Sequence, residues 1–347
     1  MFTFDKNRPL DFIVLGRIAI DINPDDFTKS FAENTVFHKF VGGSSANTAV
    51  GLSKLGCKVG FFGSVSDDSL GSYATKYLSD HGIDVSHVSR CKNGETLGLA
   101  FTEIRPDGSS NLMMYRSGPV ADLQLQADDI DGEYIASAKA IVISGTALAA
   151  SPSREAVLKA IILANLCGTK VIFDVDYRPQ TWKSLDEVSV YYTLVAQQAQ
   201  IIMGSREEFD LMDRFVAQGA EDEKTAKRWF KEHAEILIIK HGKDGSNAYT
   251  AEGRSFAIKP FPIKFLKATG GGDAYSSAFL SGLIKGLPIE ECLERGTANA
   301  SLAVAATNCS DALPYEADLV KFISEGHAAG HEVIFEKKAG NADASKS

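Results

Sequence analysis

The sequence has 347 residues, 44% of them hydrophobic and 23% charged, with a formal net charge of −9 at pH 7. This length and composition are typical of a globular α/β protein with room for one large domain and a small subdomain. The acidic balance without a Lys/Arg cluster argues against nucleic acid and membranes as partners, and five scattered cysteines without C-x-x-C spacing argue against a disulfide framework or a zinc site.

The first predicted strand, residues 11–16, is short and apolar and ends in a glycine. Asp21 follows just beyond its carboxyl end, which is where ligands bind in open α/β sheets. Asp21 is therefore a candidate binding residue; the alternative is a turn acid placed before Pro24.

A glycine pair, Gly42-Gly43, precedes a predicted helix over residues 48–55. Glycine lets the backbone approach a ligand closely, so Gly43 is a candidate binding residue. Asn47 lies in the first turn of this helix and is a second candidate, because asparagine is a poor residue for a helix interior. Capping of the helix by one of the two preceding serines is the alternative explanation of this stretch.

Three extended runs, residues 35–41, 96–104 and 110–116, predict a small β layer that is separate from the main sheet. The turn between the last two runs contains Pro-Asp-Gly, which is a hairpin signal. Arg116 ends the third run. An arginine at a strand end is usually solvated, and here it is also a candidate for capping an acidic substrate.

From residue 139 onward, apolar strands alternate with helices. Residues 140–143 and 236–239 are apolar at every position, as in parallel strands that are covered on both faces. Three successive strand ends carry charged or glycine-rich sequences, which indicates a site along one edge of the sheet. These sequences are Asp174–Trp182, Gly204–Glu208 and Lys240–Gly245.

Three consecutive glycines, Gly270, Gly271 and Gly272, run directly into Asp273 and a predicted helix. Such a turn at a helix N-terminus can point its amides at an anion, where the helix dipole also favours negative charge. A carboxylate beside this ring of N–H donors suits phosphoryl transfer, since it can accept a hydroxyl proton. The alternative is a flexible loop followed by a helix-start acid.

Together these features predict an α/β fold: a doubly wound, mostly parallel sheet with helices on both faces, plus a small β-sheet lid. We expect one domain over residues 10–327, with the lid formed from about 17–41 and 96–118, and a mobile tail over 328–347. The dinucleotide fingerprint G-x-G-x-x-G is absent after the first strand, and so are the common hydrolase motifs. With no signal core or membrane-length apolar run, we expect a cytoplasmic protein.

Three motifs occur in a fixed order: Gly42-Gly43-x-x-x-Asn47, Lys240-x-Gly242-x-x-Gly245 and Gly270-x-Gly272-Asp273. In that order they resemble the ribokinase-like (PfkB) family of sugar kinases, over about residues 10–325. The resemblance implies the ribokinase-like fold, ATP and Mg²⁺ as cofactors, and a lid that closes over the sugar. Because family members often pair through the lid, it also makes a homo-oligomer an expectation.

The resemblance implies a role for each matching position. Asp273 would be the catalytic base, with the amides of the three glycines before it as the anion hole. Sugar hydroxyls would be bound by Asp21, Gly43 and Asn47, and the nucleotide by Ser205, Lys240, Gly242, Gly245 and Asn299. Glu208 would position Mg²⁺ through water. The family has Asn where this chain has Ser205, so the details of that arrangement are open.

Many family members bind a monovalent cation through an Asp, and here that position is Lys267. A lysine would repel K⁺, so we expect no strong K⁺ activation through it.

Further stretches, among them Tyr115-Arg116 and residues 176–182, are similar to family members that phosphorylate keto sugar acids. The implied substrate is 5-dehydro-2-deoxy-D-gluconate, phosphorylated on its 6-hydroxyl group. A substrate that is an acid needs a cation, and Arg116 and Arg178 are the two candidates, because arginine grips a carboxylate with two hydrogen bonds. The alternatives are 2-keto-3-deoxygluconate or fructose as substrate, and a sugar or nucleotide sensor without catalysis.

Overall fold

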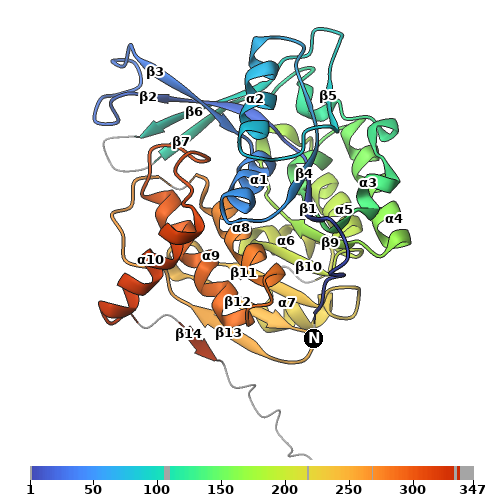
Figure 1. Ribbon diagram of the computed structural model, residues 1–347, viewed down its shortest axis with the longest axis vertical. Coiled ribbons are helices and arrows are strands. Elements are labelled where there is room, and N and C mark those ends of the chain that lie inside the picture. Colours follow the sequence, from blue (N-terminus) through green and yellow to red (C-terminus); the bar gives the residue numbers. More distant parts are fainter. Residues whose placement is uncertain (1, 105–109, 217–218, 268, 332–333, 337–347) are drawn as a thin grey trace, which may run out of the picture.

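The computed structural model describes residues 2–104, 110–216, 219–267, 269–331 and 334–336. Within them, ten strands form one large sheet in the order β14-β13-β12-β11-β10-β9-β8-β1-β4-β5. The strands from β11 to β5 are parallel, whereas β12, β13 and β14 join the edge antiparallel. The predicted fold class, a doubly wound and mostly parallel sheet with a small separate β layer, is confirmed (Figure 1).

The strands of the main sheet are β1 (Leu10–Leu15), β4 (Val59–Val65), β5 (Val88–Arg90), β8 (Ala138–Ser144), β9 (Lys170–Asp174), β10 (Ile201–Ser205), β11 (Ile236–Lys240), β12 (Ser246–Thr250), β13 (Ser255–Ile258) and β14 (Ile334–Glu336). The helices are α1 (Ser44–Lys54), α2 (Ser69–Asp80), α3 (Gly132–Ala136), α4 (Ser153–Cys167), α5 (Leu185–Ala196), α6 (Arg206–Met212), α7 (Asp222–Trp229), α8 (Gly271–Ile284), α9 (Ile289–Val304) and α10 (Glu316–Ala328).

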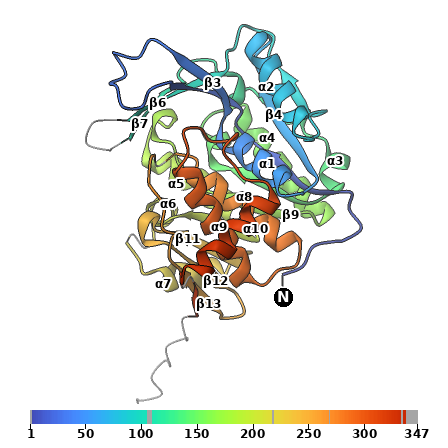
Figure 2. The ribbon, with the colours of Figure 1, turned by 60° about the vertical axis from the view of Figure 1, so that its left-hand side comes forward.

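Helices cover both faces of the sheet, as Figures 1 and 2 show from two sides. Alternation along β1 explains how: Phe12 and Val14 join the core under α1, α2, α8, α9 and α10, whereas Ile13 and Leu15 join the core under α3 to α7. A strand that is apolar at every position is stable only when both of its faces are buried. The continuous apolar runs in the sequence therefore set the two-sided architecture.

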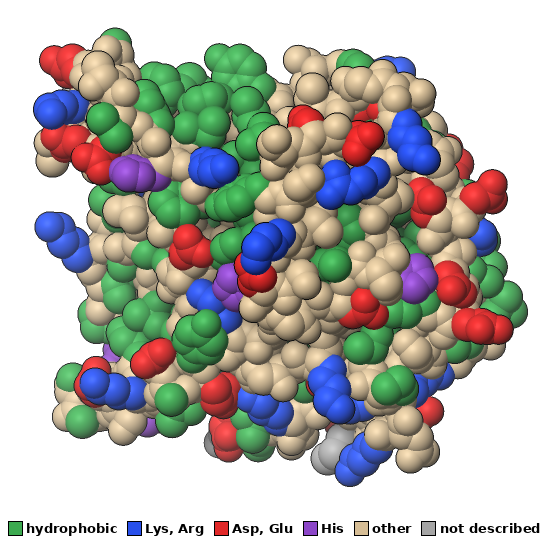
Figure 3. All heavy atoms as spheres, turned by 45° about the horizontal axis from the view of Figure 1, so that its top comes forward, with side chains coloured by type: hydrophobic (Ala, Val, Ile, Leu, Met, Phe, Trp, Pro, Cys, Tyr) green, Lys and Arg blue, Asp and Glu red, His purple; other side chains and the backbone are tan. Residues whose placement is uncertain are grey.

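The smaller sheet has the order β3-β2-β6-β7 and lies at one end of the molecule (Figure 1). Its strands are β2 (Ala19–Pro24), β3 (Phe37–Gly42), β6 (Gly98–Ile104) and β7 (Ser110–Tyr115). We call this sheet the lid. Hydrophobic side chains gather on it in Figure 3, and Val36 and Tyr115 are exposed by 55% and 63%.

The expected tail after residue 328 is not uniform, because Ile334–Glu336 form β14 and pair antiparallel with β13. Residues 337–347 of that tail, and the predicted hairpin turn at 105–109, lie outside the described residues. In the part of the chain that the structure describes, no helix combines the length and apolarity needed to cross a membrane.

Candidate active site

A cavity of about 1040 Å³ opens at the carboxyl ends of the parallel strands, beneath the lid. Its two ends have different linings. One end is formed by the lid and the loops after β1 and β9, with Arg17, Asp21, Gly43, Asn47 and Arg178; we call it the sugar end, after the ligand that the sequence resemblance predicts for three of these residues. The other is formed by the loop after β11, residues 260–265 and α9, and we call it the nucleotide end.

The start of α8 lies between the two ends. Gly270 precedes the helix with φ 83°, and a Cβ atom there would lie 2.9 Å from Sγ of Cys309. The first backbone bond of the helix runs from Ala274 N–H to Gly270 O (3.0 Å). The amides of Gly271 and Gly272 precede this bond and line the cavity, so they are available to an anion.

Asp273 sits in the first turn of α8 and is only 7% exposed. Its Oδ2 accepts a hydrogen bond from Nδ2 of Asn47 (2.8 Å), which joins two residues 226 positions apart. Burial, and after it the negative charge of Asp176, raises the pKa of Asp273 to about 7. A carboxylate with a pKa near the working pH is suited to accept a hydroxyl proton.

The loop after β9 supplies a charged pair beside Asp273. Asp176 is held at φ 39°, an unusual backbone angle for a residue other than glycine. Its Oδ1 lies 2.7 Å from Nη2 of Arg178, and its Oδ2 accepts a hydrogen bond from Oγ of Ser144 (3.0 Å). Burial opposes ionisation of Asp176, but Arg178 and the hydroxyls of Ser44 and Ser144 outweigh it and lower the pKa.

Lys240, at the end of β11, brings a cation to the anion hole. Its Nζ lies 3.5 Å from Oδ1 of Asp174, and a Cβ atom on Gly272 would lie 3.6 Å from the same Nζ. Burial alone would lower the pKa of Lys240, but Asp174, Glu208 and other nearby carboxylates hold it above its usual value. A charged lysine therefore lies beside the glycine turn that precedes α8.

Glu208, in the first turn of α6, is anchored by two backbone amides. Its Oε2 accepts from the N–H of Ser205 (2.6 Å) and its Oε1 from the N–H of Tyr177 (2.7 Å), and Ser205 Oγ accepts from Glu208 N–H in return (3.3 Å). Burial raises the pKa of Glu208. Glu208 and Asp174 both line the cavity near Lys240, and one or two carboxylates beside phosphates are how proteins commonly hold Mg²⁺.

The described residues contain no cluster of three or more His, Cys, Asp or Glu side chains that could hold a metal ion.

The nucleotide end is built largely from backbone. Gly242 and Gly245 have φ values of 56° and 101°, and a Cβ atom on Gly245 would lie 1.9 Å from the carbonyl oxygen of Ile258. Only glycine fits this turn. The apolar residues Phe261 and Phe265 and the helix α9 complete the lining, which suits the flat face of a base.

At the sugar end, two glycines just before α1 allow close contacts. Gly42 lies against the carboxylate of Asp21, and Gly43 lies against the backbone of Arg17. A Cβ atom on Gly42 would lie 2.1 Å from Oδ1 of Asp21, and one on Gly43 would lie 2.6 Å from the carbonyl oxygen of Arg17. Gly43 also has φ 96°. Burial raises the pKa of Asp21. The cavity is thus lined by Asp21, Gly43 and Asn47, the three residues for which the sequence predicted a role in binding the sugar.

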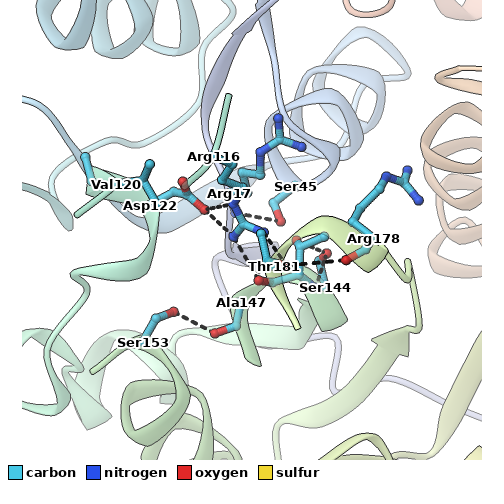
Figure 4. Close-up of polar contacts among 12 residues, drawn as sticks. Arg17, Ser45, Arg116, Val120, Asp122, Ser144, Ala147, Ser153, Arg178 and Thr181 are labelled. Carbon is cyan, nitrogen blue, oxygen red and sulfur yellow. Dashed lines mark hydrogen bonds and ion pairs between the residues drawn. The ribbon is translucent and has the colours of Figure 1, made fainter. Parts of the chain in front are cut away.

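Two predicted site residues do not line the cavity. The Arg116 side chain is buried, with Nε bonded to Oδ2 of Asp122 (3.0 Å) and Nη2 to the carbonyl oxygen of Thr146 (2.9 Å) (Figure 4). Asn299 is fully buried between α8 and α9, where its Nδ2 donates to Ala274 O (2.7 Å). Both roles were predicted from position along the chain, and neither Arg116 nor Asn299 lines the cavity.

The sequence interpretation gave no individual role to three charged residues that also line the cavity, Arg17, Asp174 and Asp176. The signal for the two aspartates is their place at the end of β9, beside Arg178. Arg17 carries a similar signal, because it follows β1 directly, but an arginine near a strand end is most often solvated. The burial of Arg17 depends on the packing of the lid and of α1, and this packing cannot be predicted from the local sequence.

Lys267, at the position where the resemblance implies a cation-binding Asp in many family members, is completely buried. Its Nζ donates to the carbonyl oxygen of Thr269 (2.8 Å) and lies 3.3 Å from Sγ of Cys309. The ammonium group therefore binds the loop that leads into the glycine turn.

A model of the pfkB family of carbohydrate kinases matches residues 10–316. A relative from Clostridium perfringens named 5-dehydro-2-deoxygluconokinase is 54% identical over 322 residues, which cover 93% of this chain and 95% of the relative. A relative of the same name from Clostridium beijerinckii is 53% identical over 323 residues, with 93% and 95% covered. Among solved structures, a fructokinase with bound ATP from Xylella fastidiosa has the same fold: its TM-score is 0.79 at 20% identity, with 91% of this chain and 99% of that chain covered.

Proposed function

Because the chain belongs to the pfkB family of carbohydrate kinases, we propose that it transfers the γ-phosphoryl group of ATP to the 6-hydroxyl group of 5-dehydro-2-deoxy-D-gluconate. The observation that carries the chemistry is the buried Asp273, bonded to Asn47 and placed in the first turn after the glycine anion hole. The names of relatives that are 54% and 53% identical over most of the chain support the substrate.

In the proposed reaction, Asp273 accepts the proton of the 6-hydroxyl group as its oxygen attacks phosphorus. The amides of Gly271 and Gly272 and the ammonium group of Lys240 stabilise the charge that develops on the transferred group. Mg²⁺, held through Glu208 and Asp174, would offset phosphate charge when the nucleotide is bound. The lid residues Ala100, Thr102 and Leu112 line the cavity. A lid closed over the bound sugar would exclude water, which would otherwise accept the phosphoryl group.

A coupled assay of ADP release tests this proposal. The panel holds Mg²⁺-ATP with 5-dehydro-2-deoxygluconate, 2-keto-3-deoxygluconate, fructose or ribose. We expect the highest kcat/KM for the first acid. A preference for 2-keto-3-deoxygluconate would keep the mechanism and replace the substrate, and a preference for a neutral sugar would contradict the choice of an acid. Binding without any turnover would favour the sensor that the sequence left open.

We also propose that two copies pair through the lid, whose exposed Val36 and Tyr115 offer an apolar surface. Light scattering of the purified protein should give twice the mass of one chain. Replacement of Tyr115 by Lys should shift it toward a monomer, and a monomeric parent protein would contradict this.

A further inference from the structure

Arg17 lies just after β1 and lines the sugar end of the cavity, yet it is only 5% exposed. Its Nε is buried without a hydrogen-bond partner. Across the described residues, its guanidinium group forms no hydrogen bond and no ion pair; the one side-chain partner of Arg17 is Oγ of Ser45, which accepts from the backbone N–H (3.1 Å). In Figure 4 the guanidinium group points away from Asp122.

Two other arginines whose charges act on Arg17, the buried Arg116 and the cavity-lining Arg178, are both neutralised by carboxylates. Arg116 is paired with Asp122, and Arg178 with Asp176 at 2.7 Å. Burying a cation without a counter-ion is costly, because the charge loses its hydration and gains nothing in return. Burial, and after it the positive charge of Arg116, lowers the pKa of Arg17, although the charges of Asp122 and Asp21 offset part of this effect. An anion that entered the cavity would remove this cost.

The backbone of Arg17 is held in place before any ligand arrives. Its carbonyl oxygen accepts from the N–H of Ala46 (3.3 Å), and its N–H donates to Ser45, so both groups are fixed to the start of α1. The left-handed Gly43 allows this close approach. A side chain carried on a fixed backbone loses less freedom when it binds, which favours affinity.

Arg17 and Asp273 also lie at different points of the sugar end. The main charges around Arg17 are Arg116, Asp122, Asp21 and Arg178, whereas those around Asp273 are Asp176, Arg178 and Asp174. The carboxylate and the 6-hydroxyl group are the two ends of the proposed six-carbon substrate, so they need partners that are apart in this way.

We infer that Arg17 binds the carboxylate of the substrate and sets the preference for a sugar acid over a neutral sugar. The inference rests on the proposed function, and it assigns to Arg17 the role that the sequence gave to Arg116. The planar guanidinium group can donate two parallel hydrogen bonds to a carboxylate, which a neutral hydroxymethyl group at the same carbon cannot accept as well.

The test compares two substrates in three variants. The substrates are the acid and a neutral analogue in which a hydroxymethyl group replaces the carboxylate. The variants are Arg17→Met, Arg17→Lys and the control Arg214→Met, which removes an arginine paired with Asp186 outside the cavity. In Arg17→Met we expect kcat/KM for the acid to fall by at least about 30-fold, mainly through KM, with little change for the analogue. Arg17→Lys should recover part of the loss.

Equal losses for both substrates, or a loss confined to kcat, would overturn the inference. Normal values in Arg17→Met would overturn it as well. Calorimetric binding of the acid without nucleotide separates this failure from failure of the proposed function. If the parent protein binds a sugar acid but does not phosphorylate it, the proposed function fails; weaker binding by Arg17→Met then still supports the role of Arg17, and equal binding overturns it.

Discussion

The two ends of the cavity are built by different means. At the sugar end, charged side chains line the space, among them the buried Arg17 and the partly buried Asp21 and Arg178. At the nucleotide end, the lining is the backbone of a glycine turn and apolar side chains such as Phe261. Charges and hydrogen-bonding groups that are fixed in space discriminate between substrates strongly, whereas a backbone cradle recognises phosphates that many reactions share. Selectivity for the acceptor should therefore depend on side chains, and nucleotide binding on backbone shape.

The largest effect is expected for Asp273, at the start of α8 between the two ends of the cavity. Asp273→Asn should lower kcat by roughly 10³-fold, because the hydroxyl group loses its proton acceptor. Affinity for ATP, measured by calorimetry, should change little. The matched control is Asp213→Asn: Asp213 is also buried, and burial raises its pKa to about 6, but it does not line the cavity. An Asp273→Asn enzyme with near-normal turnover would remove this residue from the mechanism.

The next effect tests the backbone character of the nucleotide end. Gly245→Ala should raise KM for ATP roughly tenfold, since a Cβ atom would lie 1.9 Å from Ile258 O and the loop must shift. Gly253→Ala is the control, because Gly253 also has a positive φ (89°) but has no atom within 4 Å of the added Cβ. If KM for the sugar acid changed as much as KM for ATP, the two ends would not be separable.

A change of pH should alter activity through the ionisation of Asp273. Asp273 must be ionised to accept a proton, and its pKa is about 7, so kcat/KM should rise with pH and level off above about that value. Because Asp273 and Asp176 are close, the rise reports on the pair. A profile already flat at pH 5 would contradict the raised pKa.

The same shift affects stability with a definite sign. The folded state holds the proton of Asp273 more tightly than the unfolded state, so the free energy of unfolding falls as pH rises from about 4 to about 7. Because asparagine does not ionise, the Asp273→Asn variant does not lose this stability as the pH rises. The variant should be more stable than the parent at pH 8, by roughly 1–4 kcal/mol, and the difference should vanish near pH 4. Urea titrations at both pH values measure it, and a variant that is less stable at pH 8 would contradict it.

The smallest expected effect is from potassium. Lys267 already places an ammonium group on the carbonyl oxygen of Thr269, so replacement of K⁺ by tetramethylammonium should change kcat by less than about twofold. A strong loss of activity in the organic cation would show that a monovalent ion binds elsewhere near the glycine turn.

The sequence predicted features that depend on local pattern. Continuous apolar runs give the two-sided sheet, and the glycine turn before Asp273 gives the start of α8. It could not predict features set by packing between distant segments. Arg116 follows a strand of the lid, as expected, but Asp122 and the carbonyl of Thr146 bind its side chain inside the protein. Arg17, which has no such partner, faces the cavity instead, and this difference depends on contacts that no local pattern contains.

The central claim is that the acid is held at one end of its chain and phosphorylated at the other. Carbon and phosphorus NMR of the product formed from 5-dehydro-2-deoxygluconate and ATP tests it most directly. The account predicts phosphorus coupling to carbon 6 and an unmodified carboxylate at carbon 1. Phosphorylation of another hydroxyl group, or of the carboxylate itself, would contradict it.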